Sequence, residues 1–338
     1  MKKNTNNIDY QKDEFVSLTE GSGGKEMQFL ISSIRKNLGN FKNKWQGYDE
    51  DSAYINIGNN KNVVFTTDSY TISPIFFPGG NIGDIAFCGT VNDLSVMGAK
   101  PIGLSLGIII EEGFLKNDLK KIINSISKLS KKFKIPIVTG DTKVVEKKSL
   151  DKIIINTSGI GIANNKNILN NELKIGDKII LSGGIGEHSI ALLSKRLDFE
   201  TSIITDSKAL INELLEINSL IKQAKDATRG GIASTLNELC EKNKIGMVLN
   251  EENIPVKKEV KIVCEMLGLN VYELACEGRF ICVCNKKNST KTLSILKKYN
   301  KMASIIGEVT KDNKIIIKTE LGTKILNNPT GRIVPRIC

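Results

Sequence analysis

Five aspartates stand where an apolar run of the sequence ends or where a helical segment begins. They are Asp51, Asp68, Asp93, Asp141 and Asp226. A carboxylate at such a junction lies where a rigid scaffold meets a cleft, and several that converge would bind Mg²⁺ and, through it, the phosphates of a nucleotide. Any one of them alone is better explained as a helix N-cap or a turn residue. Because most of the five stand beside Gly, Ser or Thr, the set favours a metal–nucleotide site.

Three glycine-rich segments directly precede predicted helices. The first is Gly21-Ser22-Gly23-Gly24-Lys25, and the others are SGGIGEH at 182–188 and TRGG at 228–231. Backbone N–H groups at a helix N-terminus, together with the helix dipole and Lys25, would suit a phosphate group. Each segment is equally compatible with an ordinary linker or turn. The sequence contains neither GxxxxGKS/T nor GxGxxG, so a P-loop or Rossmann nucleotide site has no support.

Cys338 is the final residue and follows a segment with two prolines and a glycine, NPTGRIVPRI. A buried structural cysteine does not fit such a tail, which leaves a chance terminal thiol or a carrier thiol. About ten extended residues give a reach of ~30 Å, enough to visit an active site or a partner protein. The single histidine, His188, argues against a Ser-His-Asp site or a multi-histidine metal site. We expect His188 to be a structural or pocket residue.

The elements that would position these residues follow from the apolar spacing. In the first half, helices are expected at 25–38, 82–97 and 115–133, and strands at 52–57, 62–67, 102–110, 135–139 and 152–162. In the second half, helices are expected after 187 and at 206–223, 232–242 and 257–267, with strands at 177–181, 247–249 and 279–284 and a closing strand region. Strict βαβ alternation is missing, which favours an α+β fold over a doubly wound sheet.

An Asn-rich stretch without periodicity, 163–173, suggests the boundary between two domains. The predicted organisation is a polar arm at 1–17, an N-terminal domain at 18–165, a C-terminal α+β domain at 166–327 and a mobile tail at 328–338 that carries Cys338. A chain of 338 residues is long enough for two cores of this size.

The bulk composition excludes several classes of protein. The net charge is +11, but the lysines are dispersed and only 5% of residues are aromatic, so nucleic-acid binding is not favoured. Seven scattered cysteines without a CxxC pair indicate a reduced cytosol, with Cys282 and Cys284 on one face of a buried strand. No apolar stretch approaches the ~20 residues of a membrane span, and no signal peptide is recognisable. We therefore expect a cytoplasmic protein without membrane contact.

The order of several sequence blocks resembles the HypE family of hydrogenase-maturation proteins, which are carbamoyl dehydratases. The blocks are TTDSYTISPIFFPGGNIGDIAFCGTVNDLSVMGAKP at 66–101, GDTKVVEK at 140–147, DATRGGIASTLNEL at 226–239, ACEGRF at 275–280 and the terminal PRIC. The resemblance runs from about Leu18 to Cys338. It implies a superfamily shared with aminoimidazole ribonucleotide synthetase, selenophosphate synthetase and thiamine-monophosphate kinase. Members have an N-terminal α+β domain that dimerises, a C-terminal α+β domain, and ATP bound near the dimer interface.

The same resemblance implies roles for individual residues. Asp51, Asp68, Asp93 and Asp226 would be the carboxylates that bind Mg–ATP. The nucleotide would also contact Asn92, Asp141, Thr142 and the loop Gly21, Ser22, Gly23, Gly24 and Lys25. Lys143 and Glu277 would lie around the modified cysteine. Cys338 would receive carbamoyl from the carbamoyltransferase HypF, and the HypC–HypD complex would accept cyanide. Glu20 stands where the family usually has His before the glycine loop, which affects the charge of the phosphate lid. Cys276 stands where the family usually has Asn before Glu-Gly, which affects the pocket around Glu277.

The implied chemistry is dehydration of a thiocarbamate to a thiocyanate. Phosphorylation of the carbamoyl oxygen by ATP makes it a leaving group, and loss of the N–H proton then expels phosphate. Glu277 could take that proton, and the structural alternative for this residue is a salt bridge with Arg279. A non-catalytic carrier that presents its tail to partners is the alternative function. A selenophosphate synthetase would need a cysteine near the glycine loop, and the first one here is Cys88.

Overall fold

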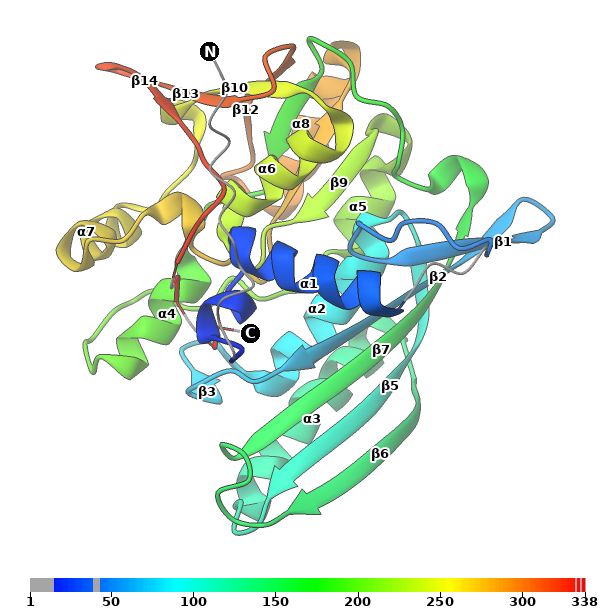
Figure 1. Cartoon of the computed structure of the whole chain (residues 1–338), viewed down its shortest axis with the longest axis vertical. Coiled ribbons are helices and arrows are strands. Elements are labelled where there is room, and N and C mark those ends of the chain that lie inside the picture. The colour runs from blue at the N-terminus through cyan, green and yellow to red at the C-terminus, as the bar shows by residue number, and fades with distance from the viewer. Residues whose placement is uncertain (1–14, 39–42, 332, 335, 338) are drawn as a thin grey trace.

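The computed structural model describes residues 15–38, 43–331, 333–334 and 336–337, and Figure 1 shows two β-sheets with helices packed on them. The first sheet has the order β1 (Ala53–Gly58), β2 (Lys61–Tyr70), β7 (Ile153–Asn164), β5 (Lys100–Glu111) and β6 (Ile137–Val145). Only β5 and β6 run parallel, and every other neighbouring pair is antiparallel. This is the mixed sheet that the predicted α+β class requires.

Helices α2 (Ile82–Val96) and α3 (Lys116–Phe133) cover one face of the first sheet. Helix α2 is buried on nearly all sides because it also contacts α5 and β9 of the second half. Its start is fixed by Asn81, whose side chain accepts a hydrogen bond from the N–H of Gly83, while Asp84 accepts one from the N–H of Asn81. This helix therefore joins the two halves and carries Asn92 and Asp93 between them.

The second sheet has seven strands. Their order is β14 (Gly322–Ile325), β13 (Ile315–Thr319), β10 (Gly246–Asn250), β12 (Ser304–Thr310), β8 (Lys178–Leu181), β11 (Phe280–Cys284) and β9 (Gln223–Asp226). Side chains on β11 alternate between two cores: Ile281 and Val283 face one, while Cys282 and Cys284 face the other. The prediction that these two cysteines share one face of a buried strand is confirmed.

Helices lie on both faces of the second sheet. They are α5 (Ile211–Ile217) and α8 (Lys286–Tyr299) on one side and α6 (Gly231–Asn243) on the other, with α4 (Glu187–Arg196) and α7 (Lys258–Leu267) beside them. Short elements complete the chain: α1 (Gly24–Leu38), β3 (Phe76–Phe77), β4 (Gly80–Asn81), and the 3₁₀ turns η2 (Leu18–Gly21), η3 (Asn165–Asn167), η4 (Asn218–Leu220), η5 (Glu251–Asn253) and η6 (Val271–Glu273). None of the helices among the described residues is long and apolar enough to cross a bilayer.

Three predicted elements are corrected by the structure. The helix expected at 206–223 is only α5: before it, Asn92 binds the carbonyl of Lys208 and the N–H of Leu210, and after it the chain passes through η4 into β9, which pairs with β11. Helix α8 was not predicted, since its Asn, Ser and Thr residues have low helix propensity and its apolar stripe is short. Strand β6 extends to Val145, so the motif Gly-Asp-Thr-Lys lies within the strand and not after it.

Candidate functional site

Four carboxylates from both halves of the chain lie within electrostatic reach of one another. Asp51 precedes β1, Asp68 lies in β2, Asp93 lies in α2, and Asp226 ends β9 of the second sheet. The hydroxyl of Thr66 donates to Asp93 Oδ2 at 2.8 Å, and that of Thr90 donates to Asp68 Oδ2 at 3.0 Å. The structure thus brings together the four aspartates to which the sequence assigned a metal, and it uses the domain junction to do so.

Burial and mutual repulsion shape the charge of this cluster. Burial, followed by the negative charges of Asp68, Asp226 and Asp51, holds the pKa of Asp93 well above its usual range. Burial and then the charge of Asp51 raise the pKa of Asp226 in the same way, and one oxygen of Asp226 is buried without a hydrogen-bond partner among the described residues. A cation bound among these groups would offset both the cost of burying the carboxylate charges and the repulsion between them.

The donor set fits a hard divalent cation, which prefers carboxylate oxygens. Among the described residues, however, no three acidic, cysteine or histidine side chains are close enough to form a ready metal site. The carboxylates would have to close around an ion for it to bind. The fit therefore rests on the chemistry of the donors and on the unsatisfied oxygen of Asp226.

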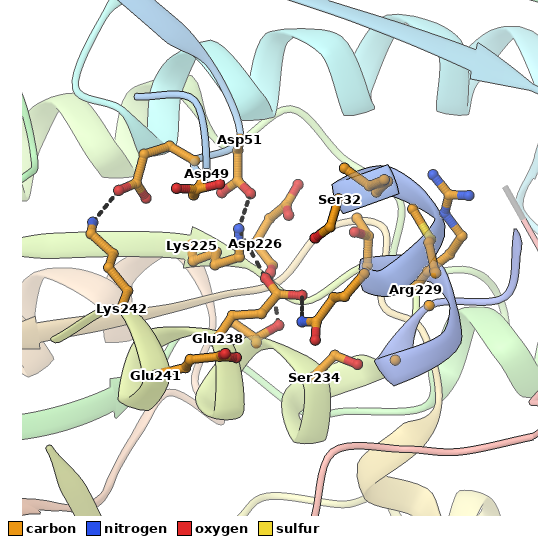
Figure 2. A pocket seen from close by; sticks show the side chains of 18 of the residues that line it. Ser32, Asp49, Asp51, Lys225, Asp226, Arg229, Ser234, Glu238, Glu241 and Lys242 are labelled. Carbon is orange, nitrogen blue, oxygen red and sulfur yellow. Dashed lines mark hydrogen bonds and ion pairs between the residues drawn. The ribbon is translucent and has the colours of Figure 1, made fainter. Parts of the chain in front are cut away.

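A lysine that sequence reasoning missed lies inside the cluster. The ammonium group of Lys225 pairs with Asp51 and lies 3.1 Å from Glu238 Oε2 (Figure 2). Burial opposes its charge, but these carboxylates outweigh burial and raise the pKa of Lys225 above its usual range. The available signal was its place directly before Asp226 on β9, where a long basic side chain reaches the same cavity.

A polar cavity of about 630 Å³ opens between α1 and α6 beside the cluster. Figure 2 shows side chains of both signs around it, with Asp226 and Lys225 on one wall and Arg229 near the start of α1. The predicted glycine loop contributes Gly23 and Gly24, which have φ of +89° and +81°. A volume of this size, lined by ionic groups and glycine backbone, suits a phosphorylated nucleotide better than an apolar ligand.

The glycine loop is fastened to the base of the C-terminal segment. The N–H of Lys25 donates to the carbonyl of Pro329 at 3.2 Å, and Glu26 Oε1 accepts from the N–H of Gly331 at 3.1 Å. A Cβ on Gly24 would lie 2.3 Å from the Pro329 carbonyl oxygen, so only glycine permits this approach. Glu20, the departure noted above, accepts from the N–H of Ser17 at 2.7 Å and closes the η2 turn.

The Gly-Asp-Thr-Lys motif lies apart from the carboxylate cluster. Asp141 and Thr142 line a separate, shallow hollow of about 420 Å³ on β5 and β6. The side chains of Asp141 and Lys143 are 73% and 67% exposed, and their charged atoms are 3.9 Å apart. The residues predicted at 140–143 are therefore not joined to the nucleotide cavity within this one chain.

Glu277 is buried and is held through its backbone. Its N–H donates to Asp206 Oδ1 at 2.8 Å, and its carbonyl accepts from the amide of Asn92 at 3.4 Å. The charge of Glu277 also contributes to the raised pKa of Asp226, after burial and the effects of Asp51 and Lys225, so the two groups interact electrostatically. Arg279 forms ion pairs with Glu187 and Asp206, at 3.5 and 3.9 Å. Glu277 thus lies between the carboxylate cluster and a buried ionic network.

Two neighbours of Glu277 have structural partners. The amide of Asn92 donates to the carbonyl of Lys208 at 3.1 Å and accepts from the N–H of Leu210 at 2.8 Å, which ties α2 to the segment before α5. Cys276 is buried, and its sulfur accepts from the N–H of Gly186 at 3.4 Å. Burial keeps the pKa of the Cys276 thiol well above its usual range, so the thiol is neutral.

Cys338 lies outside the described residues, but the chain leading to it is buried. Val334 and Ile337 are 9% and 4% exposed and belong to a large buried apolar cluster that also includes residues of α2, α3, α4 and α7. In Figure 1 the segment descends from β14 past α6 and α1 toward α4. The predicted tail is thus docked in this structure, and its mobility remains a prediction.

Comparison with known proteins matches both halves of the chain. The AIR synthase related protein family matches with its N-terminal domain over residues 49–163 and its C-terminal domain over 174–320. Carbamoyl dehydratase HypE of Rhizobium leguminosarum bv. viciae is 38% identical over 335 residues, covering 96% of this chain and 95% of the relative. The solved structure of a HypE–HypF complex includes a chain that is 41% identical, with a TM-score of 0.81, covering 89% of this chain and 99% of that one. A structure of HypE in complex with ATP is 34% identical, with a TM-score of 0.79, covering 96% of this chain and 100% of that one.

Proposed function

Because this chain belongs to the HypE family of carbamoyl dehydratases, we propose that it uses ATP to dehydrate a carbamoyl group on Cys338 to a thiocyanate. The observation that supports this most is the course of the C-terminal segment, since Ile337 is buried and contacts His188, whose partner Thr205 precedes Asp206, the acceptor of the Glu277 N–H. The thiocyanate would then supply a cyanide ligand for the iron centre of a nickel–iron hydrogenase.

The nucleotide would occupy the cavity between α1 and α6. The backbone N–H groups of the glycine loop and the guanidinium of Arg229 would contact its phosphates. Mg²⁺, held by Asp51, Asp68, Asp93 and Asp226, would supply the positive charge that a triphosphate needs. Its binding would also relieve the repulsion that raises the pKa of Asp93.

The reaction then needs one phosphoryl transfer and one elimination. The carbamoyl oxygen attacks the γ-phosphorus of ATP, ADP leaves, one of the two N–H protons is lost to solvent, and an imidate phosphate remains on sulfur. Removal of the remaining N–H proton forms the C≡N bond as the C–O bond breaks and phosphate departs. Glu277 is the proposed base, because burial favours the neutral form of a carboxyl group once it has accepted a proton. Lys143 would stabilise the charge that develops on the departing phosphate.

Lys143 can take this role only if a second subunit brings it to the cavity. Strand β6 forms the outer edge of its sheet, and Asp141, Thr142 and Lys143 lie on it, exposed. The sheet also presents several exposed apolar side chains, at Phe65, Ile102, Val138, Val144 and Ile160. We therefore propose a homodimer formed through this sheet, in which motif 140–143 of one subunit completes the site of the other.

The partners follow from the chemistry of the tail. A HypF carbamoyltransferase would load Cys338, and a HypC–HypD complex would accept the cyanide group. All six cysteines among the described residues are free and buried, which accords with a reduced cytosol and leaves the terminal thiol for loading.

Intact-protein mass spectrometry tests the proposal. The wild type and a Cys338→Ala variant are incubated with HypF, carbamoyl phosphate and Mg–ATP. The wild type is expected to gain one carbamoyl group and then to lose one water, whereas the variant gains nothing. A stable carbamoyl adduct that never loses water in the presence of Mg–ATP would favour the carrier function and overturn the dehydratase proposal.

A further inference from the structure

The end of the chain is held by the single histidine. The carbonyl oxygen of Ile337 lies 2.8 Å from His188 Nε2, and His188 Nδ1 lies 2.8 Å from the hydroxyl of Thr205. A carbonyl can only accept, so Nε2 carries the proton and Nδ1 accepts from Thr205. Thr205 Oγ1 in turn accepts from the N–H of Ser207 at 3.0 Å. Each donor in this series of contacts therefore faces an acceptor.

A second contact holds the preceding residue. The carbonyl of Arg336 accepts from the N–H of Ser73 at 3.2 Å and from the guanidinium of Arg196 on α4. The guanidinium of Arg336 donates to the carbonyl of Thr71 at 2.8 Å and pairs with Asp151. Two side chains of α4, His188 and Arg196, thus donate hydrogen bonds to successive carbonyls of the tail.

The histidine that holds the Ile337 carbonyl is buried. His188 is fully buried, and the ring of Phe77 meets it edge-to-face with centroids 5.4 Å apart. Burial lowers the pKa of His188 to about 4, so the ring stays neutral and keeps the tautomer that the two contacts require. An imidazole locked by Thr205 on one side can hold the Ile337 carbonyl without rearrangement.

The residues that hold the tail are connected to the proposed base. Thr205 precedes Asp206, and Asp206 Oδ1 accepts the N–H of Glu277 at 2.8 Å. The dipeptide Thr205–Asp206 therefore orients His188 with one residue and Glu277 with the other. Through this short segment the position of the tail and the position of Glu277 are fixed relative to each other.

We propose that His188 and Arg196 are positioning residues of the dehydration reaction, which dock the backbone of Arg336 and Ile337 so that residue 338 is presented to Glu277. This inference rests on the proposed function. The polar contacts that carry it engage the carbonyls of Arg336 and Ile337 and the Arg336 side chain, and the Ile337 side chain is buried.

Alkylation of the terminal thiol measures docking directly. The rate at which N-ethylmaleimide labels Cys338 is followed by mass spectrometry of the C-terminal peptide, since the six described cysteines are buried. His188→Leu and Arg196→Ala are expected to speed labelling about tenfold or more, because the undocked population rises. His188→Gln, which keeps a donor near the Nε2 position, should label at nearly the wild-type rate. Lys195→Ala, an exposed lysine on the same helix, is the matched control.

Dehydration supplies the second measurement. After loading by HypF, single-turnover conversion to thiocyanate should slow in His188→Leu and Arg196→Ala and recover in His188→Gln, while loading itself is retained in all variants. Labelling rates of His188→Leu and Arg196→Ala equal to that of Lys195→Ala would overturn the inference. If the wild type itself formed no thiocyanate, the proposed function would fail, whereas the labelling rates would still decide whether this clamp exists.

Discussion

The ammonium group of Lys225, on the seven-stranded sheet, pairs with the carboxylate of Asp51, which precedes the first strand of the five-stranded sheet. Both side chains are 12% exposed, so the pair is well shielded from solvent. Lys225 thus provides a positive charge inside a carboxylate cluster whose remaining members repel one another. We therefore expect the free energy of unfolding to depend on any other cation that binds among these carboxylates.

Replacing Lys225 by Met tests that dependence. Loss of a buried partner leaves Asp51 and Glu238 uncompensated, and we expect the free energy of unfolding to fall by about 3 kcal/mol in the absence of metal. Mg²⁺ should restore much of this stability in urea unfolding experiments. Lys222→Met is the matched control, since Lys222 forms a similarly shielded pair with Asp177 away from the cluster. Equal effects of Mg²⁺ on the two variants would contradict a metal site among the aspartates.

The shared site predicts complementation between subunits. Asp226→Asn and Lys143→Ala should each be inactive alone, because one damages the cluster and the other the motif supplied by the partner. Mixed in equal amounts and allowed to exchange subunits, they should recover about a quarter of wild-type dehydration, since half the dimers are mixed and each has one intact site. A mixture of Asp226→Asn with Asp51→Asn should recover nothing. Failure of the first mixture after proven exchange would contradict a site completed by Lys143 of a second subunit.

His188 predicts a specific loss of stability in acid. Its pKa is lowered to about 4 by burial, so between its ordinary pKa and this value the unfolded chain binds one more proton than the folded chain. Stability from this group is therefore present above its ordinary pKa and is lost as the pH falls. From about pH 7 to about pH 5 the loss is about 2 kcal/mol at most. In urea unfolding experiments, the free energy of unfolding of His188→Gln should fall less steeply with pH over that interval. The same pH dependence as in the wild type would contradict the assignment.

Gly24 predicts a link between the glycine loop and the tail. Because a Cβ at this position meets the Pro329 carbonyl, Gly24→Ala should displace the base of the tail and speed proteolysis within residues 328–338. Gly21→Ala is the control, as no atom lies within 4 Å of its added Cβ. In the wild type, Mg–ATP should slow the same cleavage. Cleavage that ignores both the nucleotide and the Gly24 substitution would show that loop and tail move independently.

Much of the fold could be predicted from the sequence because its helices carry regular apolar stripes. Helices α1, α2 and α3 begin and end within a residue or two of their expected bounds. Strand β6 was predicted too short because its outer half is exposed at a sheet edge, where no alternation of buried side chains marks it. Strand β9 was not predicted for a related reason: its pairing partner β11 lies far along the chain.

The site was predictable in its chemistry but not in its contacts. Carboxylates at element ends indicated a metal–nucleotide site, and four of the five lie within electrostatic reach. The fifth, Asp141, does not join them in one chain, because which strand lies at an edge is a property of the whole sheet. Lys225 and the tail contacts of His188 were missed since ion pairs and main-chain hydrogen bonds between distant segments leave no local pattern.

Strand β6 has a further consequence for how the protein behaves outside its assembly. Its outer side has no pairing strand among the described residues, and the apolar residues Val138 and Val144 are 64% and 68% exposed. An open edge of this kind recruits other β-strands, so an unassembled subunit is prone to aggregate. Substitutions that weaken the proposed homodimer should therefore lower both solubility and catalysis. In the proposed homodimer, pairing with a second copy would keep the subunits in solution as well as complete the site.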